Sequence, residues 1–277
     1  MKPLTLTCKI KDRQRLDMSW LSYIKTSELP DIKNILINYG SKQHKLSALF
    51  NISGDNCKDI VIKNSHERLD NIGSRLEEKK ITINGNVGYG LAKGMISGEI
   101  IVNGNAGKNA CCGMKGGSVH ILGNADNGLC SLPTSMNEGL VDGFIYVKKN
   151  VGDNSIIRMR RGNIVIGGDI GSGSCLELIS GSVVILGKIG KDFCYKARRG
   201  TIFTKDKSVS REYIKANETD LTFFNFYKIK INKILKQNLI SSSKPLRYFG
   251  TKSERKLVEL FVICLLYTSP SPRDQLG

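Results

Sequence analysis

Four cysteines recur at one position of a repeating sequence pattern, and an isoleucine takes that position in one repeat. The cysteines are Cys111, Cys130, Cys175 and Cys194, and the isoleucine is Ile156. Converging cysteines can bind zinc or an iron–sulfur cluster, but such sites gather their ligands around one point and commonly use Cys-x-x-Cys pairs. The sequence contains no such pair, and a stacked column is linear. Because free cysteine also behaves as a small buried hydrophobe, we assign the column to the core and predict no metal site.

Basic residues form a second recurring set. Two arginine pairs, Arg160–Arg161 and Arg198–Arg199, lie 38 residues apart, which is two repeats. Stacked repeats would place the pairs about 10 Å apart. Guanidinium groups bind carboxylates in a bidentate manner, so such a ladder can hold an extended polycarboxylate. The alternative is a solvated, partly self-paired corner that contacts another protein. The whole set, here called the basic corner, comprises Lys115, Arg158, Arg160, Arg161, Lys196, Arg198 and Arg199.

The remaining candidates for catalysis do not assemble into a site. The three histidines are scattered, and no Ser-His-Asp set or phosphate-binding loop follows from the spacings. The glycine-rich segment 85–90 is similar to a nucleotide-binding loop, but its pattern recurs in the other repeats. Glycosidases need two facing carboxylates, whereas the candidate aspartates fall at four different positions of the repeat: Asp126, Asp153, Asp169 and Asp192. We therefore predict no catalytic residue in this chain.

The charge of the chain favours an anionic partner. Its 277 residues include 42 Lys and Arg against 25 Asp and Glu, a formal net charge of +17. Such a field attracts polyanions, although the abundance of Lys, Ile and Asn is also typical of AT-rich coding sequence. A nucleic-acid-binding module is one alternative, but the sequence lacks interleaved aromatic residues and any recognised motif. We expect no nucleic-acid partner.

The N-terminal sequence and the apolar stretches predict a cytoplasmic protein. Residues 4–7 alternate Leu and Thr, which is typical of a strand and not of a signal peptide. The longest apolar stretch, 257–267, contains Glu259 and is too short to span a bilayer. We therefore expect no membrane association, and thiols that stay reduced.

A repeat positions all of these residues. Six segments share a glycine followed by a short apolar strand, and their glycines lie 19 residues apart except for one spacing of 26. The segments begin at Gly98, Gly117, Gly143, Gly162, Gly181 and Gly200. Two earlier segments, 60–62 and 81–83, fit the same pattern. Each repeat is too short to bury its own apolar residues, so neighbours must stack and share a core. The pattern predicts an all-β fold, a parallel β-helix of about seven 19-residue coils over residues 57–206.

One outward-facing column of this predicted fold is unusually apolar and implies a cover. The column contains Ile101, Tyr146, Val165, Val184 and Phe203, together with His120. Another protein is one candidate cover, which makes the column a predicted partner interface. The chain's own segment 220–239 is the other, because its apolar residues recur at helical spacing. Those residues are Phe224, Tyr227, Ile231, Ile234 and Leu235.

The segments outside the repeats are predicted as flanks. Residues 1–56 form a small mixed N-terminal region, with a strand and irregular or helical structure. Residues 207–263 form a C-terminal helical extension. The final stretch 264–277, CLLYTSPSPRDQLG, is similar to a translated sequencing adapter, and we interpret it as a non-native tail.

Several short sequence motifs resemble those of one family. They are Arg15-Leu16-Asp17-Met18, the segment 68–73, Leu132-Pro133 with Met136, Arg158-Met159-Arg160-Arg161-Gly162, and Arg198-Arg199-Gly200-Thr201. On these residues the chain resembles the C-type subunit of the bacterial formyltransferase/hydrolase complex, which is related to the C-type subunit of formylmethanofuran dehydrogenase. It is more distantly similar to the C-terminal β-helix domain of the glutamate synthase large chain. The likeness covers roughly residues 4–260.

The resemblance implies a right-handed β-helix and the role of a non-catalytic structural subunit. In the family, formyl groups move from formyl-tetrahydromethanopterin to a methanofuran-like carrier and leave as formate, during one-carbon (formaldehyde) oxidation. Two other subunits, a formyltransferase and a metal-dependent hydrolase, perform that chemistry, so a hetero-oligomer with both is expected. The carrier's polyglutamate tail would contact the basic corner, and no covalently bound cofactor is expected. The alternatives are the C-type subunit of a formylmethanofuran dehydrogenase and a basic polyanion-binding module.

Overall fold

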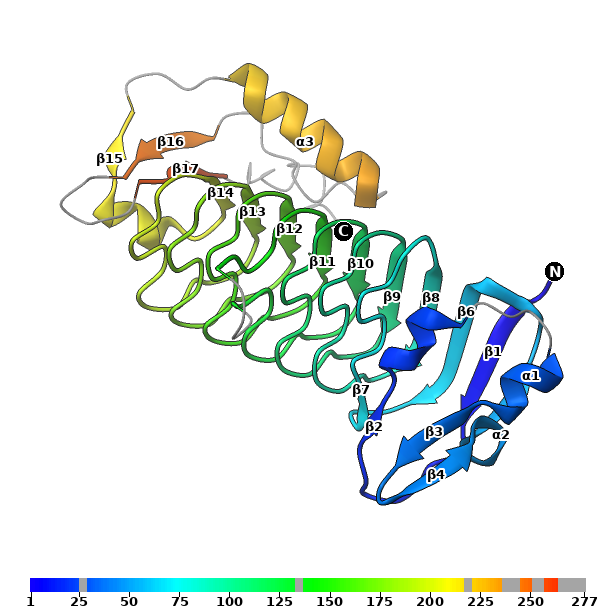
Figure 1. Cartoon of the computed structure of the whole chain (residues 1–277). Coiled ribbons are helices and arrows are strands. Elements are labelled where there is room, and N and C mark those ends of the chain that lie inside the picture. The colour runs from blue at the N-terminus through cyan, green and yellow to red at the C-terminus, as the bar shows by residue number, and fades with distance from the viewer. Residues whose placement is uncertain (25–28, 133–136, 217–220, 236–244, 251–256, 264–277) are drawn as a thin grey trace, which may run out of the picture.

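The computed structural model describes most of the chain (Figure 1). The described residues are 1–24, 29–132, 137–216, 221–235, 245–250 and 257–263. For residues 221, 234 and 235 the description covers the backbone alone. None of the helices in these ranges has the length and apolar character needed to cross a bilayer.

One 13-stranded sheet organises the molecule. Its central strands run parallel and come one from each repeat: β6 (Asn56–Ser65), β8 (Lys80–Gly85), β9 (Glu99–Asn103), β10 (Ser118–Ile121), β11 (Phe144–Val147), β12 (Asn163–Ile166), β13 (Ser182–Ile185) and β14 (Thr201–Thr204). β-branched residues favour this pleated environment, and the pairing keeps the register that the glycine spacing predicts. Val119, for example, lies opposite Ile100 on one side and Ile145 on the other. The 26-residue repeat therefore joins the sheet without a shift in register.

The predicted fold class, a right-handed parallel β-helix of about seven coils, is wrong. The structure has one 13-stranded, mostly parallel sheet with few helices. In the described part of the chain, only one segment of each full repeat is a strand of four or more residues, and the wall that follows it holds single-residue bridges that do not extend into a second long-stranded sheet. These bridges join Val87, Ala106, Ala125, Val151, Ile170 and Ile189 in sequence.

Turns replace further long strands because each repeat contains several residues in the left-handed region. The four cysteines of the column have φ values of 60°, 53°, 57° and 56° at Cys111, Cys130, Cys175 and Cys194. Non-glycine residues adopt this conformation at a cost of about 1 kcal/mol each. Stacking offsets the cost through repeated backbone hydrogen bonds, such as Cys194 N to Ser174 O at 3.0 Å.

Strands from the N-terminal region extend one end of the sheet. The elements are β1 (Pro3–Cys8), β2 (Leu16–Asp17), α1 (Leu29–Asn34), β3 (Leu36–Tyr39), β4 (Lys42–Lys45), α2 (Leu46–Leu49) and β5 (Phe50–Ser53). β1 pairs parallel with β6, and β5 closes the order with an antiparallel pairing to β1. β2 pairs with β7 (Leu69–Asp70) in a separate two-stranded sheet, so the two Arg-Leu-Asp phrases of the sequence stack in register.

The C-terminal segment extends the other end and adds a cover. Its elements are β15 (Ile214–Lys215), α3 (Leu221–Leu235), β16 (Leu246–Phe249) and β17 (Glu259–Val262). β17 pairs parallel with β14, and β16 then pairs antiparallel with β17. The segment predicted as a helical extension therefore contains three strands as well as α3 and a short 3-10 helix, Lys207–Glu212. Figure 1 shows α3 lying along the outer side of the strand row.

The stacked repeats predict a steep dependence of stability on the inward column. Ile164 in β12 is fully buried between Ile145 and Val183. We expect Ile164→Ala to lower the free energy of unfolding by about 2–5 kcal/mol and Ile164→Val by about 0.5–1.5 kcal/mol. Urea unfolding followed by circular dichroism measures both. The exposed Lys148→Ala control should stay within about 0.5 kcal/mol of the parent; equal effects of all three would contradict the stacked core.

Candidate functional site

The basic corner lies in the turns that precede the strands. Arg160 N donates to Leu140 O at 2.8 Å, and Arg198 N donates to Leu178 O at 2.7 Å. Because each of these bonds reaches back to the preceding repeat at the same step, Arg160 and Arg198 occupy equivalent positions two repeats apart. Lys115 N makes the same kind of bond to Met95 O, at 2.7 Å. The structure therefore places Lys115, Arg160 and Arg198 at the same position of their repeats, on one edge of the stack.

Two members of the basic corner are paired with carboxylates. Arg160 Nη1 lies 2.8 Å from Glu138 Oε1, and Arg158 Nε lies 3.8 Å from Glu177 Oε2. Both arginines are partly or largely exposed, so these pairs add little to stability. The remaining members make no ion pair within the described residues: Lys115, Arg161, Lys196, Arg198 and Arg199. The corner is therefore partly self-paired and keeps five cations for an anionic partner.

A cavity of about 660 Å³ adjoins the Lys115 end of the corner. Two further cations line it, Arg75 and Lys93, with the side chains of Ser19 and Tyr23 from the N-terminal region. Asp17 also lines the cavity, but its two oxygens already accept hydrogen bonds from the Ser19 backbone at 2.8 Å and from an asparagine side chain at 3.2 Å. The cations that line this cavity make it suited to binding an anion.

Sequence reasoning missed this part of the basic surface. Arg75 occupies the same repeat position as Arg158 and Lys196, so the register contained the signal. That signal is weak, because Arg75 stands alone in an early repeat and belongs to no arginine pair. The packing of residues 15–24 against that repeat could not be inferred from local pattern, because it joins segments more than 50 residues apart.

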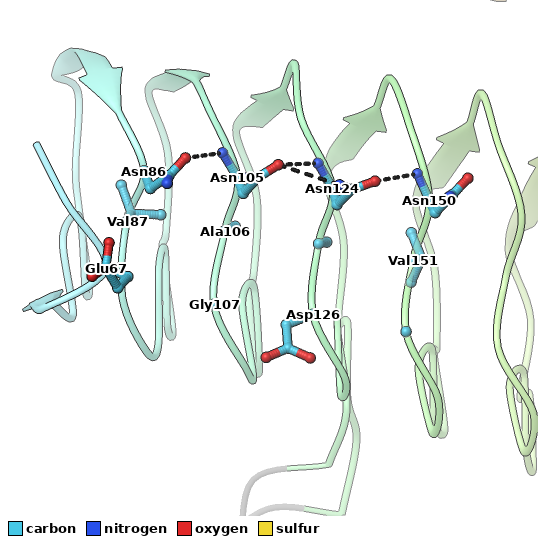
Figure 2. A pocket seen from close by; sticks show the side chains of 12 residues that line it. Glu67, Asn86, Val87, Asn105, Ala106, Gly107, Asn124, Asp126, Asn150 and Val151 are labelled. Atoms are coloured by element: carbon cyan, nitrogen blue, oxygen red, sulfur yellow. Dashed lines mark hydrogen bonds between the residues drawn. The ribbon is translucent and has the colours of Figure 1, made fainter.

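A second hollow, of about 670 Å³, follows the turn after the strands and is shown in Figure 2. Asparagine side chains run along it, each pointing to the next repeat. Asn86 Oδ1 accepts from Asn105 N at 2.9 Å, and Asn105 Oδ1 accepts from Asn124 N at 2.8 Å. The row continues from Asn124 to Asn150 N at 3.1 Å. The amide oxygens therefore hold the backbone of the neighbouring repeat, which is a folding role.

Two carboxylates of this hollow also face a neighbouring cavity that contains a guanidinium. Glu67 and Asp126 line both the hollow and an adjoining cavity of about 500 Å³. In this adjoining cavity Arg15 binds Asp70 through two contacts, Nε–Oδ2 at 2.6 Å and Nη2–Oδ1 at 2.5 Å. Asp70 also accepts from Tyr89 N at 2.7 Å. These bonds fasten the N-terminal region to the first repeats, so Arg15 and Asp70 serve the fold.

The predicted partner-interface column divides into two parts. Tyr146, Val165, Val184 and Phe203 are buried in a second hydrophobic cluster with α3, which contributes Phe224, Tyr227 and Ile231, and with Phe261 and Ile263. Phe203 stacks on Tyr227 with ring centroids 4.5 Å apart and on Phe261 at 5.1 Å. Ile101 lies outside this cluster and is half-buried. The chain's own helix thus covers four of the five residues.

The cysteine column is buried in the main core. Cys111, Cys130, Cys175 and Cys194 are all fully buried, and the described residues contain no group of three or more side chains placed to hold a metal ion. Burial raises the pKa of the Cys130 and Cys175 thiols well above the ordinary value. It also raises the pKa of neighbouring Cys112 to about 11. A thiolate is the reactive form, so these thiols are poor nucleophiles at neutral pH.

The raised thiol pKa values predict slow labelling in the folded state. At pH 8 we expect the seven buried cysteines to react with a disulfide reagent only after denaturation, because burial limits access to all of them. For Cys112, Cys130 and Cys175 the raised pKa also limits thiolate formation. Cys264 lies outside the described residues, so the measurement uses a Cys264→Ser variant. Counting fast-reacting thiols by absorbance before and after adding guanidinium checks this. Fast reaction of any Cys111, Cys130, Cys175 or Cys194 thiol in the folded variant would contradict the core assignment.

Comparison with solved structures shows a similarity that extends over nearly the whole chain. No protein-family model and no curated protein matches the chain. Among solved structures, the chain is similar to one in the crystal structure of the formyltransferase/hydrolase complex (FhcABCD) from Methylorubrum extorquens in complex with methylofuran. The TM-score is 0.79 at 28% sequence identity, and the match covers 94% of this chain and 100% of that chain.

Proposed function

We propose that this chain is a non-catalytic structural subunit of a formyltransferase/hydrolase complex. The single observation that carries the proposal is the full-length match to a chain of such a complex, at an identity that supports more than a shared fold. The non-catalytic role is supported further because polar side chains and thiols of this chain are occupied in the fold. Asparagine oxygens bind neighbouring backbone, and the Cys130 and Cys175 thiols lie in the core with raised pKa values.

In this proposal the chain belongs to a cytoplasmic hetero-oligomer with a formyltransferase subunit and a metal-dependent hydrolase subunit. Those two subunits would move the formyl group from formyl-tetrahydromethanopterin to a methanofuran-like carrier and release it as formate. The stacked repeats would give them a rigid support, since each repeat is fixed to the next by backbone hydrogen bonds.

The basic corner supports a second part of the proposal, contact with the carrier's polyglutamate tail. Arg161, Arg198 and Arg199 are exposed and make no ion pair within the described residues. Repeats one strand spacing apart set such cations about 5 Å or 10 Å apart along the edge. An extended polycarboxylate presents charges over comparable lengths, and arginine binds carboxylates in a bidentate manner.

Assembly tests the first part of the proposal. We expect the full chain, co-expressed with the formyltransferase and hydrolase subunits of the same genome, to form a stoichiometric complex in native mass spectrometry. Formyl transfer and hydrolysis should then co-purify with the complex, and the chain alone should have neither activity. A chain that ignores both subunits would overturn the proposal. Stable binding to dehydrogenase subunits would identify the formylmethanofuran dehydrogenase alternative.

Charge reversal tests the carrier contact. We expect the triple variant Arg161→Glu, Arg198→Glu, Arg199→Glu to bind synthetic hexaglutamate at least about tenfold more weakly than the parent, a change of about 1.4 kcal/mol. Calorimetry at two salt concentrations measures the affinity, which should fall with added salt.

A matched control makes the same change in net charge elsewhere. Lys148, Lys149 and Lys188 are exposed and lie outside the basic corner, so Lys148→Glu, Lys149→Glu, Lys188→Glu should retain most of the affinity. Equal loss in both triple variants would show that hexaglutamate responds to net charge alone and would rule out a site at the corner.

A further inference from the structure

Helix α3 has apolar residues on two opposite faces. Its inner face seals the outer side of the sheet through Phe224, Tyr227 and Ile231, which are 0%, 4% and 0% exposed. Its outer face carries Phe226 and Ile229, which are 67% and 66% exposed. Single exposed apolar residues are common on protein surfaces, but two large ones at a spacing of three residues lie side by side on a helix.

The surroundings of this outer pair are cationic. The helix sequence, LTFFNFYKIKINKIL, contains three lysines and no acidic residue. Lys230 and Lys233 are exposed, and the 3.6-residue period places both on the same side of the helix as Phe226 and Ile229. The outer face therefore presents an apolar centre with a positive rim.

We propose that this outer face, centred on Phe226 and Ile229, docks into an apolar groove with an acidic rim on a partner subunit. The inference rests on the proposed function, because that function supplies partner subunits. The inference goes beyond the proposed function because it assigns the contact surface on this chain and the chemistry of the partner's groove. Paired apolar anchors on one helix face are a common mode of helix-in-groove recognition, and complementary charge at the rim sets orientation and association rate.

Charge excludes a second copy of this chain as the occupant. The formal net charge is +17, and two outer faces of α3 would bring Lys230 and Lys233 of one copy against those of the other, without a carboxylate from either helix. Like charges brought together in this way oppose association. An acidic partner would be attracted to these lysines, whereas a second copy would be repelled.

The burial pattern also favours a protein over a membrane. A helix that binds lipid inserts its larger apolar face between the headgroups. In α3 that larger face is already packed on the sheet, where Phe224 and Ile231 are fully buried. The outer face offers two apolar anchors with exposed Asn225 beside them, which suits a shaped groove better than a lipid surface.

The test uses the full chain with the partner subunits. We expect the variant Phe226→Asp, Ile229→Asp to raise the dissociation constant for the complex at least about tenfold, as removal of interface anchors does. The isolated variant should unfold at nearly the parent temperature, because both side chains are exposed. Phe226→Ser, Ile229→Ser provides an uncharged version, should the first variant fold poorly. Lys230→Glu, Lys233→Glu should weaken assembly and reduce its salt dependence.

The matched control carries the same substitutions at exposed apolar residues away from α3. Leu36 and Ile214 are 57% and 61% exposed, and Leu36→Asp, Ile214→Asp should assemble like the parent. Unchanged assembly of the α3 variants would overturn this inference and leave the proposed function intact. Failure of the parent chain to assemble would overturn both. Binding of the parent to phosphatidylserine vesicles, lost in the Phe226→Asp, Ile229→Asp variant, would instead assign the face to a membrane.

Discussion

The register between repeats is the constraint on which the rest of the structure depends. A single repeat has too few apolar residues to bury, so its stability comes from the neighbour on each side. Strand pairs, turn-to-turn backbone bonds and asparagine side chains all fix the same offset, as at Ser118 and Glu99 in β10 and β9. The one longer repeat obeys it too, since Ser118 pairs with Phe144. Every surface feature is therefore a column whose spacing the backbone sets.

The sequence predicted this register well because it is local and periodic. Glycine spacing located the six central strands β9 to β14, and the helical spacing after residue 220 located α3. The fold class was wrong for a physical reason. Whether the rest of a repeat forms strands depends on residues such as Cys130 and Ile156 adopting positive φ, and neither residue type signals that conformation. The pairings of β1, β5, β16 and β17 were out of reach because they join distant segments.

The candidate site likewise has one part that the sequence could predict and another that it could not. Residues in one column, such as Arg160 and Arg198, could be grouped from the sequence because equal positions in the repeat become equal positions in space. Arg75 and Lys93 share their cavity with Ser19 and Tyr23, and only the packing of the N-terminal region creates that cavity. The apolar column predicted a cover, and the sequence left open whether the chain's own helix or another protein supplies it. In the structure four residues of the column share a buried cluster with α3 and with Phe261 and Ile263.

The two ends of the sheet give the molecule a defined length. A stack of identical parallel strands offers the same unsatisfied backbone row at each end, and in principle further chains could continue it. Here the order finishes with antiparallel pairings, β5 on β1 at one end and β15 on β16 at the other. The last strand at the second end is two residues long, too short to template another chain. The row of parallel repeats is thus bounded on both sides by flanking strands of different direction, and the short last strand disfavours end-to-end growth into a fibre.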